Sequence, residues 1–225
     1  MNLEGVEKTM LLTLYAKARH SKDKNHKFYD SKAVEIISNI DYDFSIAEKD
    51  KFMQLGTIAR TIVLDEMVSD YINAHPECTI VNIASGMDTR FNRLDNGKIN
   101  WYNVDLENSA HYRLKYIEDT DRVKTLAYSA MDPNWTQEIE IRNDVLFIVE
   151  GLTMYLNQKD VEDIINIIDA DFDKCTIFME IMPPFSVKNA KEKSIEDTNS
   201  KFIWGVEKGH ELTAFNPNFK WIKDV

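Results

Sequence analysis

The stretch CTIVNIASGMDTR at residues 78–90 decides the fold of this chain, because a short apolar run ends there in a turn of small residues. Residues 78–84 have the length and the apolar character of a buried strand. Ala84, Ser85 and Gly86 would let a ligand approach the backbone, and a helix beginning after them would offer free N–H groups. A tight turn without a ligand explains the same residues, so the stretch alone predicts only a strand and a turn.

Other apolar runs recur along the chain, separated by helical or polar segments. They predict strands at residues 99–106, 123–127, 144–149 and 175–182. The clearest crossover helix covers residues 158–168, where apolar side chains recur on one face. This alternation predicts an α/β fold with a parallel sheet covered by helices on both faces. Such sheets bind ligands beyond the carboxyl ends of their strands, so functional residues should follow each run.

The residues before the first strand show no β-type alternation and are predicted to be helical. We expect helices at residues 5–20, 31–40 and 50–74. Ser31 precedes an apolar-periodic run and is the expected N-cap of the second helix. Pro76 follows the end of the third helix.

The composition narrows the classes of partner. The chain carries 27 Lys and Arg against 38 Asp and Glu, a formal net charge of −11, which disfavours nucleic acid because phosphate binding relies on concentrated positive charge. No apolar stretch approaches the roughly 20 residues that cross a bilayer, and charges come too early for a signal peptide. The two cysteines suit a reducing compartment. We expect a cytoplasmic protein that binds neither nucleic acid nor membrane.

Asp105 ends the second predicted strand, about 20 residues after the small-residue turn. In nucleotide-binding α/β folds an acid at this place accepts hydrogen bonds from ribose hydroxyls. The alternative is an aspartate that caps a helix. The chain offers no second glycine for a dinucleotide fingerprint, so an NAD-dependent reductase is a weaker prediction than a protein that binds a ligand with one ribose and no pyrophosphate.

Four blocks of sequence, in order, carry a resemblance to a known family. The blocks are NIASGMDTRFNRLD at 82–95, WYNVDLE at 101–107, AYSAMDPNW at 127–135 and VLFIVEGLTMYL at 145–156. Together they resemble the leucine carboxyl methyltransferase and tetracenomycin-type polyketide O-methyltransferase family of class I S-adenosylmethionine-dependent methyltransferases. The resemblance implies a Rossmann-like sheet, the cofactor S-adenosylmethionine, and N-terminal helices that cover the cofactor and help to form the substrate pocket.

The same resemblance assigns roles to residues near the first two strands. Arg60, in GTIARTIVLD, matches an arginine that pairs with the methionine carboxylate of the cofactor, a task that suits a bidentate guanidinium. Ala84, Ser85 and Gly86 match the loop beside the methionine moiety. Relatives usually have glycine at the position of Ala84, so the alanine could weaken binding.

Asp105 matches the ribose-binding acid, with Leu106 beside the cofactor. Ser129 and Ala130 match the pair that reads the adenine edge, where many relatives have an aspartate. Asp132 could substitute for that aspartate, or could cap the segment before Pro133.

Glu150, at the end of the fourth strand, matches a glutamate near the methionine end, and burying it unpaired would be costly. Tyr155 matches a tyrosine near the methyl-transfer site and is the candidate catalytic residue, with substrate positioning as its expected role. A half-buried tyrosine with its hydroxyl in water is an equally good interpretation.

The expected function is therefore an S-adenosylmethionine-dependent O-methyltransferase that acts on a carboxylate or phenolate of a small molecule. A carboxylate is already ionised at neutral pH, whereas a phenol benefits from a base. The five histidines lie at scattered positions, which favours a carboxylate slightly. A non-catalytic protein that binds S-adenosylmethionine is the alternative, because Ala84 and Ser129 depart from the family pattern.

We expect a single methyltransferase domain, with a helical cap at 1–75, a cofactor-binding core at 76–182, and a lid segment with the last strand at 183–225. Residues 219–225 resemble the sixth strand of relatives, which continue into a seventh, antiparallel strand. A sheet without that strand would have an unpaired gap or edge, which a homodimer could cover.

Overall fold

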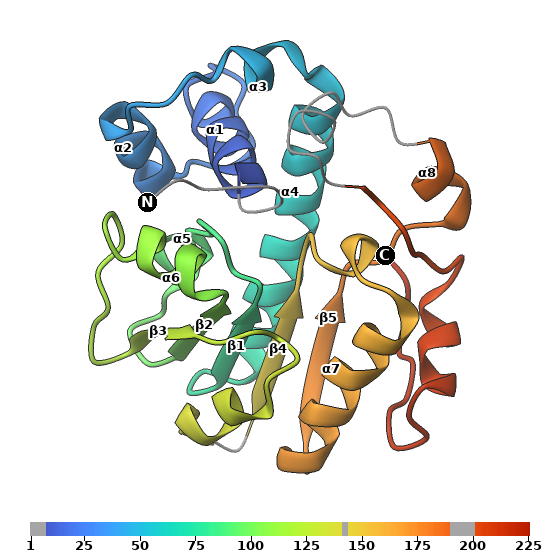
Figure 1. Ribbon diagram of the computed structural model, residues 1–225. Helices are drawn as coiled ribbons and strands as arrows, with labels where there is room; N and C mark the ends of the chain where they lie inside the picture. The colour runs from blue at the N-terminus through green and yellow to red at the C-terminus, as the bar shows by residue number, and fades with distance from the viewer. Residues whose placement is uncertain (1–7, 141–143, 190–200) are drawn as a thin grey trace.

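A five-stranded parallel sheet forms the centre of the computed structural model, which describes residues 8–140, 144–189 and 201–225 (Figure 1). The strand order is β3-β2-β1-β4-β5, and all four strand pairs are parallel. The strands are β1 (Thr79–Ile83), β2 (Asn100–Asp105), β3 (Val123–Ala127), β4 (Val145–Val149) and β5 (Cys175–Met179). The five predicted strands and the α/β fold class are confirmed. Strand order reverses between β1 and β4, which is where such sheets bind ligands.

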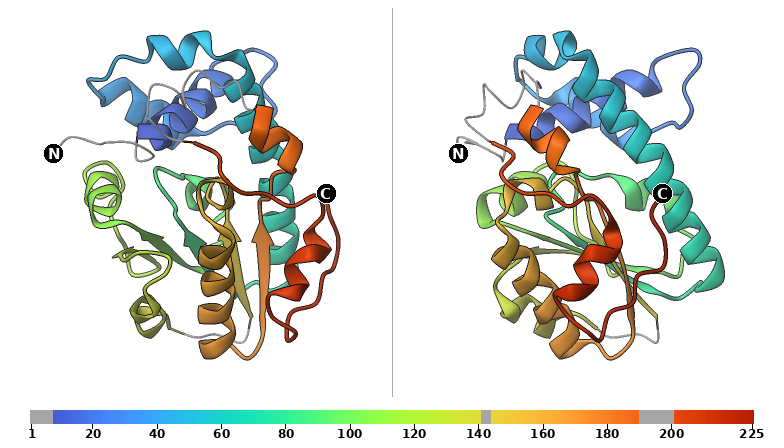
Figure 2. Two further views of the ribbon diagram at one scale, coloured as in Figure 1. Left: turned by 45° about the vertical axis from the view of Figure 1, so that its right-hand side comes forward. Right: turned by 90° about the vertical axis from the view of Figure 1, so that its right-hand side faces the viewer.

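Alternate side chains of the strands pack into two cores, one on each face of the sheet. On one face Val81 and Phe147 pack with Ile164 of α7 (Gln158–Asp171). On the other face Ile80 packs with the C-terminal half of α4 (Lys51–Ala74). Figure 2 shows α4 and α7 on opposite sides of the sheet. This continuous burial explains why the strand sequences read as apolar runs.

The N-terminal helices lie over the carboxyl ends of the strands (Figure 1). They are α1 (Thr9–Ser21), α2 (Ser31–Asn39), the short α3 (Ser45–Lys49) and the first half of α4. Leu11 and Leu14 of α1 pack with Ile36 of α2 in a separate apolar cluster. The three predicted helices are present, and α3 was not predicted. Residues 5–7 of the first predicted helix lie outside the described residues.

The N-cap of α2 was predicted wrongly. Asp30, not Ser31, is the N-cap, and its carboxylate accepts a hydrogen bond from the Ala33 N–H at 2.8 Å. Ser31 is the first residue of the helix. A carboxylate satisfies a free N–H and favours the positive end of the helix dipole, so it takes this position over the neighbouring hydroxyl.

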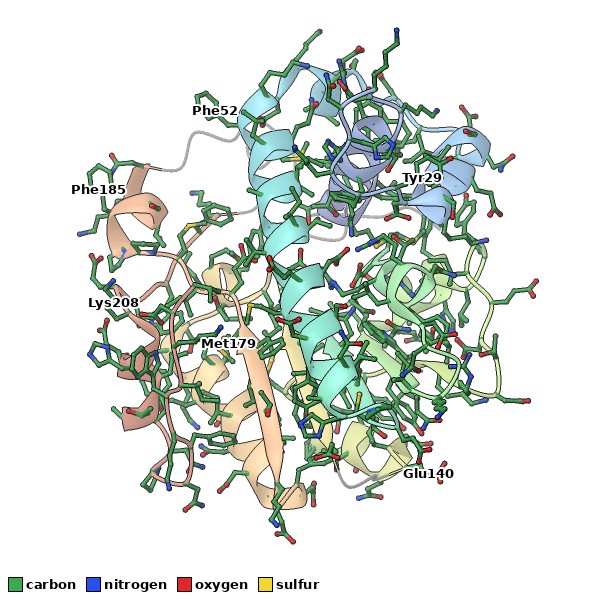
Figure 3. All side chains as sticks on the ribbon, turned by 180° about the vertical axis from the view of Figure 1, so that it is seen from behind. Tyr29, Phe52, Glu140, Met179, Phe185 and Lys208 are labelled. Atoms are coloured by element: carbon green, nitrogen blue, oxygen red, sulfur yellow. The ribbon has the colours of Figure 1, made fainter. Side chains whose placement is uncertain are left out.

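Short elements connect the strands to the larger helices. Between the strands lie α5 (Arg90–Leu94), α6 (Glu107–Arg113) and two 3-10 helices, η2 (Pro133–Glu138) and η3 (Thr153–Tyr155). After β5 the described residues contain α8 (Pro184–Asn189) and the 3-10 helix η4 (Gly209–Ala214). Seen from behind, Phe52 of α4 and Phe185 of α8 extend away from the protein (Figure 3). The lid part of the expected 183–225 segment includes residues 190–200, which are outside the described residues.

The strand predicted at residues 219–225 is absent, because this segment has no regular secondary structure. Asn216 and Asn218 both donate to the carboxylate of Asp169 on α7, at 3.1 and 2.8 Å. The Asn218 N–H also bonds the Asn216 side chain at 2.9 Å, which is a local turn. These bonds hold the chain against the helix that covers the sheet, so it does not pair with β5.

Residues 201–206 pass very close to the residues that follow β5. A Cβ atom added to Gly205 would lie 2.0 Å from the carbonyl oxygen of Met182, so only glycine fits there. The Ile203 N–H bonds the Met154 carbonyl of η3 at 2.8 Å. Residues 201–206 are thereby fixed beside the β4 and β5 strand ends. Within the described ranges, none of the helices is both long and apolar enough to cross a membrane.

Candidate functional site

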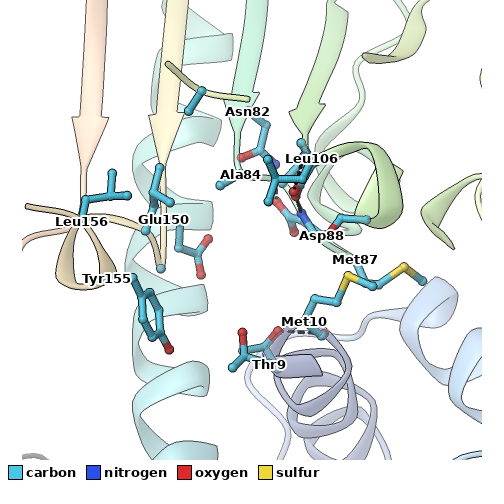
Figure 4. Close-up of a pocket in the computed structure, with 18 of the residues that line it drawn as sticks. Thr9, Met10, Asn82, Ala84, Met87, Asp88, Leu106, Glu150, Tyr155 and Leu156 are labelled. Atoms are coloured by element: carbon cyan, nitrogen blue, oxygen red, sulfur yellow. Dashed lines mark hydrogen bonds between the residues drawn. The ribbon is translucent and has the colours of Figure 1, made fainter. Parts of the chain in front are cut away.

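A cavity of about 310 Å³ lies between the carboxyl ends of the strands and α1. Figure 4 shows Glu150 and Tyr155 on one side, Asp88 and Met87 on the other, and Thr9 and Met10 of α1 facing them. The structure brings all ten sequence-predicted site residues to this cavity. They are Arg60, Ala84, Ser85, Gly86, Asp105, Leu106, Ser129, Ala130, Glu150 and Tyr155.

The turn after β1 has positive φ angles, which glycine adopts most easily. Gly86 has a φ of 48°, and Ala84 has a φ of 53°, a left-handed conformation that L-residues adopt at a cost. A Cβ atom at Gly86 would lie 2.9 Å from the Cβ of Met10, so α1 packs directly on the turn. Ser85 lines the cavity, and its buried hydroxyl has no hydrogen-bond partner among the described residues.

Asp105 meets this turn at the end of β2. Its carboxylate accepts hydrogen bonds from the Gly86 N–H at 2.6 Å and from the Leu106 N–H at 2.8 Å. Burial raises the pKa of Asp105 above its usual range, and the two N–H donors oppose this shift. The N-cap residue of α6 is Leu106, so Asp105 is not the N-cap of this helix. The acid and the small-residue turn that the sequence singled out are therefore in direct contact.

Arg60 and Glu150 form an ion pair at the opposite side of the cavity. Arg60 Nε donates to Glu150 at 2.7 Å, and Nη1 donates to both oxygens of Glu180 at 3.0 and 3.2 Å. Burial alone would raise the pKa of Glu150, but Arg90 and Arg60 outweigh burial and hold it at about 2. Among the hydrogen bonds of the described residues, Nη2 of Arg60 makes neither of these bonds, and Arg60 lines the cavity.

Sequence reasoning missed Glu180. It follows β5 as Glu150 follows β4, and this position was the available signal. Its carboxylate also accepts a hydrogen bond from the Gly151 N–H at 2.7 Å, so it fixes both Arg60 and the turn after β4.

A buried ion network continues beneath the cavity and was also missed. The guanidinium of Arg90 is completely buried and contacts Asp65 at 2.7 Å, Asp88 at 2.6 Å and Glu150 at 2.8 Å. Lys17 of α1 pairs with Asp88 at 3.3 Å and lines the cavity. Burial would raise the pKa of Asp88, but Arg90 and Lys17 keep it well below its usual range. These ion pairs hold the charged side chains of the site in place.

The loop after β3 forms the third side of the cavity. The Ser129 hydroxyl accepts a hydrogen bond from the Met131 N–H at 3.3 Å. Asp132 caps η2 through a 3.0 Å bond from the Asn134 N–H and does not line the cavity, which favours the capping interpretation. Behind the loop, the fully buried Trp135 donates from Nε1 to the Ala130 carbonyl at 3.3 Å.

Tyr155 lies where η3 meets the returning C-terminal segment. Its ring contacts Phe202 edge-on, with ring centroids 5.1 Å apart. From α1, Thr9, Thr13 and Lys17 contribute polar groups at helical spacing, and this polar stripe was not recognised in the sequence. None of the five histidines lines the cavity. The described residues contain no cluster of metal-ligating side chains.

Comparison with known proteins agrees with this geometry. A family model described as leucine carboxyl methyltransferase matches residues 10–169. The tetracenomycin polyketide synthesis O-methyltransferase TcmP of Streptomyces glaucescens is 26% identical over 224 residues, covering 98% of this chain and 83% of the relative. The S-adenosyl-L-methionine-dependent methyltransferase dpfgK of Gibberella zeae is 26% identical over 246 aligned residues, covering 98% of this chain and 82% of the relative.

A solved structure supports the fold. The crystal structure of a protein from Thermobifida fusca YX, described as a candidate methyltransferase, has a TM-score of 0.56 and 12% identity, covering 89% of this chain and 79% of that one. The matches confirm the family resemblance carried by the four sequence blocks, and S-adenosylmethionine is the cofactor that they imply. The chain therefore belongs to the leucine carboxyl methyltransferase family and is an S-adenosylmethionine-dependent methyltransferase.

Proposed function

We propose that the chain transfers a methyl group to an oxygen atom of a small molecule, a carboxylate or a phenolate. The observation that carries this proposal is the junction of Asp105 with the turn at Gly86, inside a cavity that also holds the Arg60 and Glu150 pair. The name of the relative TcmP, an O-methyltransferase, supports oxygen as the acceptor atom.

The cavity residues fit the cofactor. Asp105 presents a carboxylate already oriented by two N–H donors, as ribose hydroxyls require. The unpartnered Ser85 hydroxyl can bond the methionine moiety. Arg60, through Nη2, would hold the methionine carboxylate, and Glu150 would attract the ammonium group.

At the other end of the cofactor, Ser129 and Ala130 would bond the adenine edge, with Leu106 packing against the base. These roles fit the positions of the three residues along the cavity wall. Ser129 offers a neutral hydroxyl where a carboxylate would bind the amino group more strongly.

When bound, S-adenosylmethionine supplies a methyl group on a positively charged sulfur. The chain then contributes positioning and a water-poor cavity, which supply most of the catalysis for an in-line displacement. Glu150, with a pKa of about 2, is a poor base at neutral pH. With no histidine among the residues that line the cavity, an acceptor that is already ionised suits the site best, and Tyr155 would orient it.

Calorimetry with S-adenosylhomocysteine tests the site. We expect the wild-type chain to bind it, and Asp105→Asn to weaken binding about 10- to 100-fold, because a charge-assisted hydrogen bond is lost. Asp163→Asn, on the exposed face of α7, is the matched control and should bind normally. Equal affinity of Asp105→Asn and the control would contradict the assignment.

Methyl transfer to a panel of small carboxylic acids and phenols tests the reaction. Mass spectrometry should detect an O-methyl ester or ether from at least one acceptor. Binding of S-adenosylhomocysteine without transfer to any acceptor would instead favour the non-catalytic binding protein. The left-handed Ala84 is the observation that speaks for that alternative, because it departs from the family glycine.

A further inference from the structure

Arg113, the last residue of α6, is buried under the turn that lines the cavity. Its residue exposure is 2%, and its Nη1 donates to the carbonyl of Gly86 at 3.1 Å and to the carbonyl of Asp88 at 2.6 Å. These two carbonyls flank Met87. Arg113 therefore closes the turn from the side opposite the cavity.

The partners of Arg113 are unusual for a buried cation. In the part of the chain that the structure describes, Arg113 takes part in no ion pair, and its Nε has no hydrogen-bond partner. The equally buried Arg90, by contrast, contacts three carboxylates. Burial lowers the pKa of Arg113, and the carboxylates of Asp88, Asp105 and Asp119, which are not in ion-pair contact with it, oppose this shift. Burying a charge is costly unless it is paired, and among the described residues the Arg113 hydrogen bonds go to neutral carbonyls, so its position calls for a reason beyond its own bonds.

The position of Gly86 supplies that reason. Its N–H donates to Asp105 and its carbonyl accepts from Arg113, so both backbone groups of one glycine link the carboxylate to the guanidinium. The positive charge of Arg113 favours the ionised form of Asp105 through this link.

The other charges near Asp105 are already paired. Asp88, on the same turn, is held by Lys17 from α1 and by Arg90 from α5. Across the cavity, Arg60 of α4 is held by Glu150 and Glu180. Arg113 is the cation that favours the ionised form of Asp105, although it also faces Asp88 and Asp119.

We propose that Arg113 is a positioning residue of the cofactor site, which fixes the turn at Gly86 and supplies the positive charge that faces the ribose-binding Asp105. The inference rests on the proposed function, because it assumes that Asp105 binds the ribose. Arg113 acts through the turn and does not line the cavity.

The test compares Arg113→Met, Arg113→Lys and wild type for binding of S-adenosylhomocysteine by calorimetry between pH 5 and pH 9. Arg113→Met should weaken binding about tenfold or more at pH 7.5, because the turn loses a charged donor. As pH is lowered, its affinity should also begin to fall at a higher pH than that of wild type. The reason is that Asp105 loses the charge that favours its ionised form. Arg113→Lys should keep the wild-type pH profile while recovering only part of the affinity.

Arg122→Met is the matched control. Arg122 also donates to a backbone carbonyl, that of Ile99 at 3.0 Å, but Ile99, unlike Gly86 and Asp88, does not line the cavity. Arg122→Met should leave affinity and pH profile unchanged. Wild-type affinity with an unshifted profile in Arg113→Met would overturn the inference.

If Arg113→Met proves unfolded by circular dichroism, Arg113→Lys decides. Unchanged affinity in that variant, or a shifted pH profile, contradicts the proposal. Failure of the wild-type chain to bind S-adenosylhomocysteine would contradict the proposed function instead, so the two failures are distinguishable.

Discussion

Ala84 combines a left-handed backbone with a side chain that disfavours it. Its φ of 53° lies in a region that costs an L-residue about 1–2 kcal/mol, and glycine avoids this cost at the expense of a more flexible unfolded chain. We expect Ala84→Gly to stabilise the protein by about 0.5–1 kcal/mol in urea unfolding. The turn should also reach its binding conformation more easily.

The control for this substitution is Ala59→Gly on the exposed side of α4. There the backbone is helical, so glycine should destabilise by about 1 kcal/mol. Similar destabilisation by both substitutions would show that the strain at Ala84 has no energetic weight.

Glu150 is the carboxylate on which two buried arginines depend. Glu150→Gln keeps the shape of the side chain but leaves Arg60 and Arg90 short of negative charge, so we expect a loss of about 3–5 kcal/mol in the free energy of unfolding at pH 7. Glu162→Gln on the surface of α7 should change it by less than about 0.5 kcal/mol. A small effect at Glu150 would mean that the network rearranges at little cost.

The same carboxylate predicts how stability depends on pH. The folded pKa of about 2 lies below the ordinary value for glutamate, so the folded state gains stability above pH 4.5 and loses it as pH falls toward 2. Acid titration followed by circular dichroism should show steeper destabilisation in this range for wild type than for Glu150→Gln. Parallel curves would assign the acid sensitivity to other groups.

For single residues, the sequence predicted which positions belong to the site better than it predicted which residues contact one another. The turn and Asp105 were predictable because each ends an apolar run. The position of Glu180 after β5 was a signal, but its contact with Arg60 was not predictable, because 120 positions of sequence separate the two residues. The role of Arg113 could not be predicted either, because its partners are backbone carbonyl groups, which no side-chain pattern reveals.

Among the elements, the segment 201–206 depends on one glycine. Gly205→Ala would place a Cβ atom 2.0 Å from the Met182 carbonyl oxygen, so the segment must move and lose its contact with η3. We expect a loss of about 2–3 kcal/mol in urea unfolding. Gly56→Ala is the matched control, since nothing lies within 4 Å of its added Cβ and it is within α4, and it should stabilise by about 1 kcal/mol. Equal effects would contradict the close approach.

Strands were predicted more accurately than the C-terminal segment for a physical reason. Residues of β1 and β4 are buried on both faces, and such burial leaves a continuous apolar pattern. Residues 219–225 mix apolar side chains with Lys220, Lys223 and Asp224, and Trp221, Ile222 and Val225 stay exposed. The asparagine bonds to Asp169 decide the path of this segment, and they could not be read from its hydropathy.

For the whole molecule, the helical cap is held to the sheet by ionic contacts as well as apolar ones. Arg93 of α5 pairs with the buried Asp30 at 2.5 Å, and Lys17 pairs with Asp88. We expect one cooperative urea transition, with coincident curves from far-ultraviolet circular dichroism and from tryptophan fluorescence. Asp30→Asn removes the charge but keeps a capping oxygen. In this variant the circular-dichroism signal of the helices should fall at a lower urea concentration than the tryptophan fluorescence changes. Two separate transitions in wild type would show that cap and core unfold independently.

Trp135 gives the molecule an internal reporter. Its indole is held by the Ala130 carbonyl on the wall of the cavity, and all the other tryptophans lie elsewhere in the chain. We expect an adenine ring bound against Ala130, as proposed above, to alter the polarisation of that carbonyl and hence the emission wavelength of the indole. Association and release of the nucleoside can therefore be timed by rapid mixing, without attaching a dye.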